Sequence, residues 1–162
     1  MPILGASDNI VRPECLNATI VLDLDADNKR ADWKPCTKYC DILGLYFYPN
    51  YSRTDLINAS GLGTTALQVK EETGLPILVI ETSYPTGPRI LEFDEEKQSQ
   101  HVRAGCEEAS TCDAITSLGW LRFSDCYRKS FPPQENRFAL HTREGRPRSE
   151  WNDHMTQVRQ RR

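Results

Sequence analysis

The sequence predicts an α/β fold built from parallel β–α units, and two observations support this. Short continuous apolar runs, typical of strands buried on both faces, alternate along the chain with longer polar stretches of helical composition. No internal repeat, linker or low-complexity segment interrupts the alternation, so residues 1–162 are expected to form a single domain. A chain of 162 residues is long enough to bury a sizeable core.

Each expected strand comes from an apolar run with a recognisable end, and the segments between strands have helical or polar character. Strands are expected at 18–24, 41–48, 77–80 and 118–123, and helices at 54–73, 95–114 and 149–159, with the end of another helix at residues 10 and 11. This order favours right-handed parallel crossovers. Four such units cannot be a complete eight-unit barrel, which takes about 250 residues.

Composition excludes several classes of partner. The net charge of −3 gives no electrostatic reason to expect a nucleic acid or an anionic membrane, and the basic residues concentrate in the terminal stretch 143–162, interpreted as solvated. No apolar stretch approaches the ~18 residues that span a bilayer, and no signal segment opens the chain. Three N-x-S/T sequons, at Asn17, Asn50 and Asn58, weakly indicate that the parent protein is extracellular.

The six cysteines do not predict a metal site. The spacings Cys36-x3-Cys40 and Cys106-x5-Cys112 differ from those of zinc sites, and no paired histidines lie near them. We therefore expect no metal and no cofactor. In an extracellular protein, a local disulfide between Cys106 and Cys112 is the more plausible use of these residues.

Glu81 is the first candidate for chemistry. It follows the apolar run 77–80, which Gly74 opens and Pro85 closes, so it is expected at the carboxyl end of a buried strand. A carboxylate there is costly to bury without partners or a task. In a barrel of parallel strands, active sites are built at that end. The structural alternative is a carboxylate tied to a helix N-terminus or an arginine.

Asp23 and Asp25 form a second candidate pair. An apolar strand ending in Asp-x-Asp resembles the nucleophile motif of Mg²⁺-dependent phosphohydrolases of the haloacid-dehalogenase type. The usual Gly-Thr or Thr-Val after the second aspartate is absent, and no later acidic pair follows an apolar strand. A calcium loop also fails, because Asn28 and Lys34 occupy the positions that require Gly and Glu. Solvated or substrate-facing aspartates are the simpler interpretation.

Two strand motifs carry a family resemblance. Residues 41–49 are Asp-Ile-Leu-Gly-Leu-Tyr-Phe-Tyr-Pro, and residues 74–85 contain Gly-Leu-Pro, an apolar run and Glu-Thr-Ser-Tyr-Pro. In combination they resemble strands six and seven of the clan A retaining glycoside hydrolases, most nearly the endo-β-1,4-galactanases of arabinogalactan. Further matches are Gln98, the triplet 138–140, Gly145 and Trp151, so the resemblance covers about residues 10–152.

The resemblance implies a fold and roles for individual residues. The chain would be the C-terminal half, strands five to eight, of a (β/α)8 barrel, with Glu81 as the catalytic nucleophile. Tyr46 or Tyr48 would orient that nucleophile or floor the sugar site, and Trp120 or Phe123 would stack on the sugar. Tyr84, within the second motif, is a further substrate-binding candidate. Ordinary packing is the alternative for these aromatic residues, and His101, His141 and His154 are interpreted as structural or solvent-facing.

One catalytic part is missing from the sequence. The family takes its acid/base from an Asn-Glu pair after strand four, and no Asn-Glu dipeptide occurs here. The leading hypothesis is therefore a glycoside hydrolase with a carbohydrate substrate whose acid/base lies outside this chain. The alternatives are a non-catalytic half-barrel acting through a partner, either a complementary half or another copy joined at open sheet edges, and the phosphohydrolase using Asp23 and Asp25.

Overall fold

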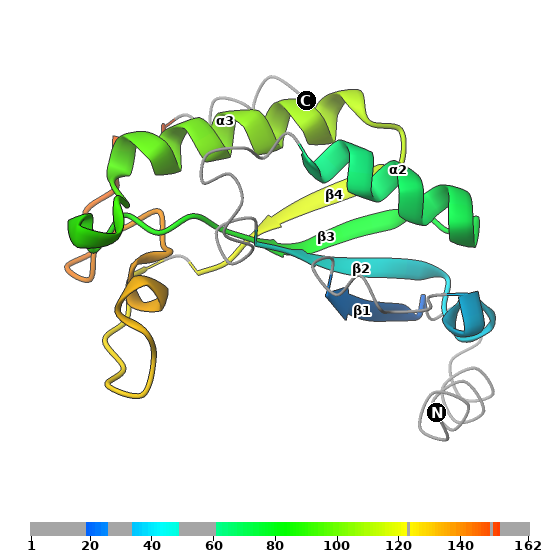
Figure 1. Ribbon diagram of the computed structural model, residues 1–162, viewed down its shortest axis with the longest axis horizontal. Coiled ribbons are helices and arrows are strands. Elements are labelled where there is room, and N and C mark those ends of the chain that lie inside the picture. The colour runs from blue at the N-terminus through cyan, green and yellow to red at the C-terminus, as the bar shows by residue number, and fades with distance from the viewer. Residues whose placement is uncertain (1–18, 26–33, 49–60, 123, 150, 153–162) are drawn as a thin grey trace.

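The computed structural model describes residues 19–25, 34–48, 61–122, 124–149 and 151–152 (Figure 1). Strands and helices alternate along these residues. In chain order the elements are β1 (Val21–Asp25), the 3-10 helix η1 (Lys34–Tyr39), β2 (Ile42–Phe47), α2 (Leu62–Thr73), β3 (Ile77–Thr82), the 3-10 helix η4 (Arg89–Leu91), α3 (Glu95–Thr111), β4 (Ile115–Trp120) and the 3-10 helix η5 (Pro133–Arg137). A further helix begins at Ser149.

The strands form one parallel sheet in the order β1-β2-β3-β4. Spatial order follows chain order without reversal, whereas a doubly wound sheet reverses its order at a switch point. Helices α2 and α3 lie on the same side of the sheet in Figure 1, with α3 packed on β4 and α2 on β3. One helical layer on one face is the arrangement of a barrel segment, and the predicted α/β class with parallel units is confirmed.

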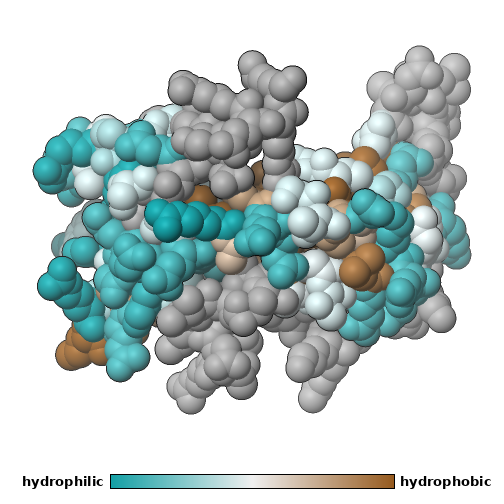
Figure 2. Space-filling model, turned by 90° about the horizontal axis from the view of Figure 1, so that it is seen from above, coloured by the Kyte–Doolittle hydropathy of each residue, from teal (hydrophilic) through white to brown (hydrophobic). Residues whose placement is uncertain are grey.

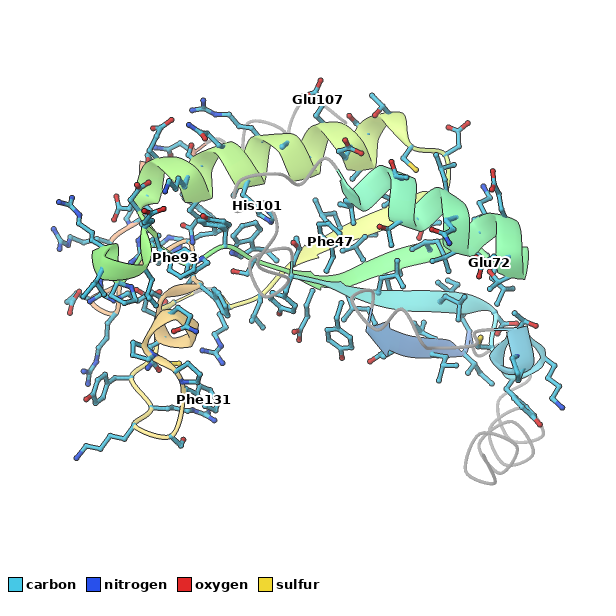
Figure 3. All side chains as sticks on the ribbon, viewed as in Figure 1. Phe47, Glu72, Phe93, His101, Glu107 and Phe131 are labelled. Atoms are coloured by element: carbon cyan, nitrogen blue, oxygen red, sulfur yellow. The ribbon has the colours of Figure 1, made fainter. Side chains whose placement is uncertain are left out.

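The core lies between the sheet and the two helices. Alternate residues of β2 and β3 point toward the helices and are fully or almost fully buried, as the period of a strand requires. They meet the apolar faces of the helices; the cluster includes Leu43, Leu45, Phe47, Ile77 and Val79 from the sheet and Leu62, Ala66 and Val69 from α2. Figure 3 shows Phe47 in this layer.

The outer surface of the helical layer is largely hydrophilic (Figure 2). Leu67 on α2 is a large apolar side chain exposed in this layer, which is ordinary for a folded protein. Within the described residues, no helix is long and apolar enough to cross a membrane.

Several predicted boundaries shift. The helix expected at 54–73 is described from Leu62 and ends at Thr73, as predicted. It is followed by Gly74, whose φ of 74° suits glycine. The helix expected at 95–114 ends earlier, at Thr111. The last strand spans Ile115–Trp120 instead of 118–123, since its polar and exposed residues at 116 and 117 hide the strand pattern. Of the predicted helices, residues 10, 11, 54–60, 150 and 153–159 lie outside the described residues.

The predicted disulfide between Cys106 and Cys112 is wrong, because neither cysteine is part of a disulfide bond. Six residues along a helix turn through about 600°, which leaves the two side chains on different faces of α3. Cys106 packs with Val102 and Leu140, while the Cys112 thiol lies 3.6 Å from the carbonyl oxygen of Gly63. Cys40 and Cys126 are not disulfide-bonded either.

A buried arginine fastens the segment that follows β4. The guanidinium of Arg148 donates to both carboxylate oxygens of Asp125, at 3.2 and 2.7 Å, and to Glu95 of α3 at 3.2 Å. It also donates to the carbonyl oxygen of Ala139 at 2.7 Å. Burial alone would lower the pKa of Arg148, but the bonds and charges of Asp125 and Glu95 outweigh it and raise that pKa. The C-terminal segment is thereby held against the start of α3.

Candidate active site at the carboxyl ends of the strands

A β-bulge in β3 determines where Glu81 points. Beside β2 the register passes from Leu45↔Val79 to Tyr46↔Glu81, so β3 contains one extra residue. The register to β4 also shifts between Val79 and Thr82. Strict alternation after the helix-facing Val79 would aim Glu81 at the helices. The bulge instead places Glu81 with Tyr46, on the sheet face opposite the helices.

Tyr48 holds the carboxylate of Glu81. Its hydroxyl donates a hydrogen bond of 2.7 Å to Oε2 of Glu81, and both side chains are half-buried. The Tyr48 ring packs on Phe138, with ring centroids 5.9 Å apart. A charge-assisted bond from a packed ring fixes the orientation of the carboxylate more firmly than water would. The position of Glu81 at the carboxyl end of β3 agrees with the sequence prediction.

Tyr46 makes the corresponding contact to a carboxylate on β1. Its hydroxyl donates to Oδ2 of Asp23 at 3.0 Å, and Asp23 is exposed. The bond to Asp23, followed by burial and the negative charges of Asp23 and Glu81, raises the pKa of Tyr46. The two tyrosines of one strand therefore serve two carboxylates on neighbouring strands. The sequence left open which tyrosine orients Glu81; in the structure it is Tyr48.

Asp23 belongs to no metal-binding cluster among the described residues. Among the described residues, no group of three or more His, Cys, Asp or Glu side chains could hold a metal ion. Asp23 accepts from a phenol instead, and the side chain of Asp25 lies outside the described part. The structure thus supplies nothing that favours the phosphohydrolase alternative over a carbohydrate site.

Two predicted sugar-binding aromatics lie elsewhere. Tyr84 is 1% exposed and packs on Phe93 and His101, so it has no free face for a sugar, and we do not assign it a substrate contact. Trp120 is half-buried on the helix side of β4 and donates from Nε1 to the carbonyl oxygen of Phe138 at 3.0 Å. Phe123, the alternative platform, lies outside the described residues.

The carbonyl oxygen of Phe138 is a junction that the sequence did not reveal. It accepts hydrogen bonds from Ser83 at 2.9 Å, Trp120 at 3.0 Å and Gln98 at 3.3 Å. Ser83 follows β3, Trp120 lies on β4 and Gln98 lies on α3. Donors from three parts of the fold therefore fix Phe138, the residue on which the Tyr48 ring packs. Gln98 was noted only as a family landmark, and its second bond, to the carbonyl oxygen of Tyr84 at 2.6 Å, explains its burial.

His101 supports the same end of the sheet from behind. It lies between α3 and the sheet (Figure 3), and its Nε2 is 3.1 Å from the hydroxyl of Thr82, the residue after Glu81. Burial lowers the pKa of His101 to about 4, so the ring is neutral near pH 7. The interpretation of this histidine as structural agrees with its place.

Comparison with known proteins gives a likeness of fold. No protein-family model matches the sequence, and no curated protein matches it. Among solved structures, a GH2 β-galacturonidase from Eisenbergiella tayi bound to galacturonate superposes with a TM-score of 0.75 at 15% identity, over 96% of this chain and 30% of that one. A β-glucuronidase from an uncultured Clostridium species gives 0.74 at 16% identity, over 98% and 29%.

A further neighbour extends the likeness to another glycoside hydrolase family. The GH17 β-1,3-glucanosyltransferase from Rhizomucor miehei gives a TM-score of 0.70 at 15% identity, over 92% of this chain and 55% of that one. The chain thus spans less than a third of the first two neighbours and about half of the third. The fold is that of part of an α/β barrel of the kind found in glycoside hydrolases.

Proposed function

We propose that this chain contributes the nucleophile side of a retaining β-glycosidase active site, with Glu81 as the nucleophile. The observation that carries the proposal is the 2.7 Å bond from Tyr48 to Glu81 on the helix-free face, at the carboxyl end of a parallel sheet. Active sites of barrel enzymes lie at that end. The glycoside hydrolase neighbours, which act on β-linked sugars by their names, support the same class of bond.

In this mechanism, an oxygen of Glu81 attacks the anomeric carbon of the sugar. The glycosidic C–O bond breaks as the new C–O bond forms, and the leaving oxygen takes up a proton from a second carboxyl group. Water then attacks the same carbon and releases Glu81, with that second group acting as base. Tyr48 keeps one carboxylate oxygen fixed through both steps, so that the attack follows one direction.

The second carboxyl group is assigned to a complementary half-barrel. A retaining site needs the two carboxyl groups about 5–5.5 Å apart. Within the described residues, β1 and β4 each pair with one neighbour and so present an unpaired edge. Upstream β–α units, or a separate chain with the same architecture, would pair with these edges and place an acid opposite Glu81.

The test avoids the missing acid. A 2,4-dinitrophenyl 2-deoxy-2-fluoro-β-glycoside has a leaving group that departs as a stable anion, so the nucleophile can be trapped without protonation. The full chain should gain the mass of one fluorosugar on the peptide that contains Glu81. The variant Glu81→Gln should not be labelled, and Asp23→Asn should be labelled like the parent. Labelling of neither parent nor Asp23→Asn, in folded protein, would favour the non-catalytic alternative.

A further inference from the structure

A groove of about 280 Å³ lies between the loops that follow β3 and β4. Its wall combines cations with aromatic rings and one amide. The side chains used below are those of Tyr127, Arg128, Lys129, Phe131, Asn136 and Arg137. No acidic residue is part of the described lining, although acidic residues outnumber basic ones in the sequence. The described lining is therefore positively charged, in a chain whose net charge is negative.

An aromatic ring positions two guanidinium groups at the groove. The guanidinium of Arg128 lies over the ring of Phe131, 5.3 Å from its centroid, and Arg122 lies at the same distance from that ring. An aromatic face positions a cation through its quadrupole but carries no net charge. Arg128 and Lys129 are both exposed, so their charges face the solvent of the groove.

The side chain of Asn136 fixes the conformation of the loop that carries Arg128. Oδ1 of Asn136 accepts from the backbone nitrogen of Arg128 at 2.8 Å, and its Nδ2 donates to the carbonyl oxygen of Arg128 at 3.3 Å. The two bonds join residues eight apart in the sequence. A loop fixed before binding loses less conformational freedom when a ligand arrives.

The groove lies on the same end of the sheet as Glu81. Arg137 ends η5 and is followed by Phe138, on which the Tyr48 ring packs, and Tyr48 donates to Glu81. Figure 3 shows Phe131 on the loop beyond the ends of the strands. One short series of contacts thus connects the residue that holds the carboxylate with the loop that forms the groove.

We propose that this groove is a binding subsite for an acidic oligosaccharide, one that contains uronic acid units. The carboxylates of the sugar would meet Arg128, Lys129 and Arg137, and a sugar ring would stack on Tyr127, which is 68% exposed. A phenol offers an apolar face with a polar edge, which suits a sugar ring. The inference rests on the proposed function in taking the ligand at Glu81 to be a carbohydrate, and it narrows that ligand to an anionic one.

The experiment measures binding directly, so that it does not depend on turnover. The full chain is titrated calorimetrically with a β-1,4-linked tetramer of glucuronic acid and with cellotetraose, the neutral sugar of the same linkage. We expect the acidic tetramer to bind at least tenfold more tightly. Its affinity should weaken severalfold between about 50 mM and 300 mM NaCl, because exposed charges are screened by salt.

Variants locate the binding. Replacing Arg128 and Lys129 together by glutamine should weaken binding of the acidic tetramer about tenfold, since exposed ion pairs are individually weak. The matched control replaces Arg143 and Arg146, exposed cations on a different turn, and should leave the affinity unchanged. The variant Tyr127→Ala should weaken binding of the acidic tetramer severalfold.

Three results would overturn the proposal: equal affinity for both tetramers, equal losses in the two double variants, or tighter binding of a short RNA than of the acidic tetramer. The variant Glu81→Gln separates this proposal from the catalytic one. It should retain the groove's affinity while losing covalent labelling. If the fluorosugar labels Glu81 but the acidic tetramer binds no more tightly than cellotetraose, only the groove proposal is contradicted. If the acidic tetramer is preferred but Glu81 is not labelled, only the proposal that Glu81 is the nucleophile is contradicted.

Discussion

Gly119 on β4 lies against the backbone carbonyl of Ile80 on β3 so closely that a Cβ atom at this position would overlap the carbonyl oxygen. Ile80 is part of the bulge that turns Glu81 to the helix-free face. On the other side of the bulge, a Cβ at Gly44 would overlap the side chain of Ile80. Two glycines thus leave the space in which the extra residue fits, and Gly119 faces backbone that cannot rotate away.

The variant Gly119→Ala should therefore disturb the bulge. We expect a loss of about 1–3 kcal/mol in the free energy of unfolding, typical of overpacking. Because the strain falls on the bulge, labelling of Glu81 by the fluorosugar should fall more than tenfold even below the unfolding transition. Urea denaturation and the labelling rate measure the two effects separately.

Gly105→Ala is the matched control. Gly105 lies within α3, and a Cβ there would meet only the Leu118 side chain at 3.8 Å, an ordinary contact. Alanine is the better helix former by roughly 1 kcal/mol, so this variant should be at least as stable as the parent and fully labelled. Unchanged labelling in Gly119→Ala would show that the bulge does not position Glu81.

Removing the Tyr48 hydroxyl should affect Glu81 more than it affects the fold. In Tyr48→Phe the ring still packs on Phe138, but the 2.7 Å bond to Glu81 is lost. Hydrogen bonds to charged groups contribute about 1.5–3 kcal/mol, so we expect labelling to slow roughly 10- to 100-fold. Tyr46→Phe, which loses the bond to Asp23, should label within about threefold of the parent. Similar losses in both variants would mean that the two tyrosines act only on the sheet.

Arg148 should be among the most sensitive residues for stability. Arg148→Met leaves Asp125, whose side chain is 12% exposed, without its bidentate partner, and removes donors from two carbonyl oxygens. Breaking one side of a buried ion pair costs about 3–5 kcal/mol. The exposed Arg146→Gln should change the unfolding free energy by less than about 0.5 kcal/mol. Adding Asp125→Asn to Arg148→Met should restore part of the loss, and no recovery would contradict the ion-pair explanation.

The sequence predicted most of the sheet because the central strands are continuous apolar runs. β2 and β3 are buried on the helix side and partly covered on the other, so their composition carries the strand pattern. β4 was placed three residues late, since Thr116 and Ser117 are exposed in the described structure and look like loop. Helix boundaries moved for a similar reason, as polar caps resemble polar turns.

The position of Glu81 near the end of a strand could be predicted from the sequence, but the direction of its side chain could not. Glu81 was expected from its place after an apolar run, but the bulge depends on register between three strands, which one strand's sequence does not contain. The same register explains Tyr84: two residues past the buried Thr82, its side chain turns into the interior instead of toward the helix-free face. Gly44 and Gly119 were the available signal, because each is a glycine inside a strand.

His101 gives a prediction about pH. Burial holds its pKa at about 4 in the folded state, below the ordinary value of about 6.5 that applies to the unfolded chain. Between these values the unfolded state binds a proton that the folded state does not, so stability falls as pH decreases from about 6.5 to 4. The full difference corresponds to about 3 kcal/mol. Above pH 7 His101 is neutral in both states, so it no longer makes the free energy of unfolding depend on pH.

The measurement compares unfolding free energies at pH 7 and pH 4.5 in the parent and in His101→Gln. Glutamine can still bond to the Thr82 hydroxyl but does not titrate, so its variant should lose about 2–3 kcal/mol less between these two pH values than the parent loses. The acid sensitivity of all other groups cancels in this difference. Equal losses in the two proteins would mean that His101 takes up its proton in the folded state as readily as in the unfolded one. The ring packed on Tyr84 and Trp120 would then be charged, not neutral, at pH 4.5.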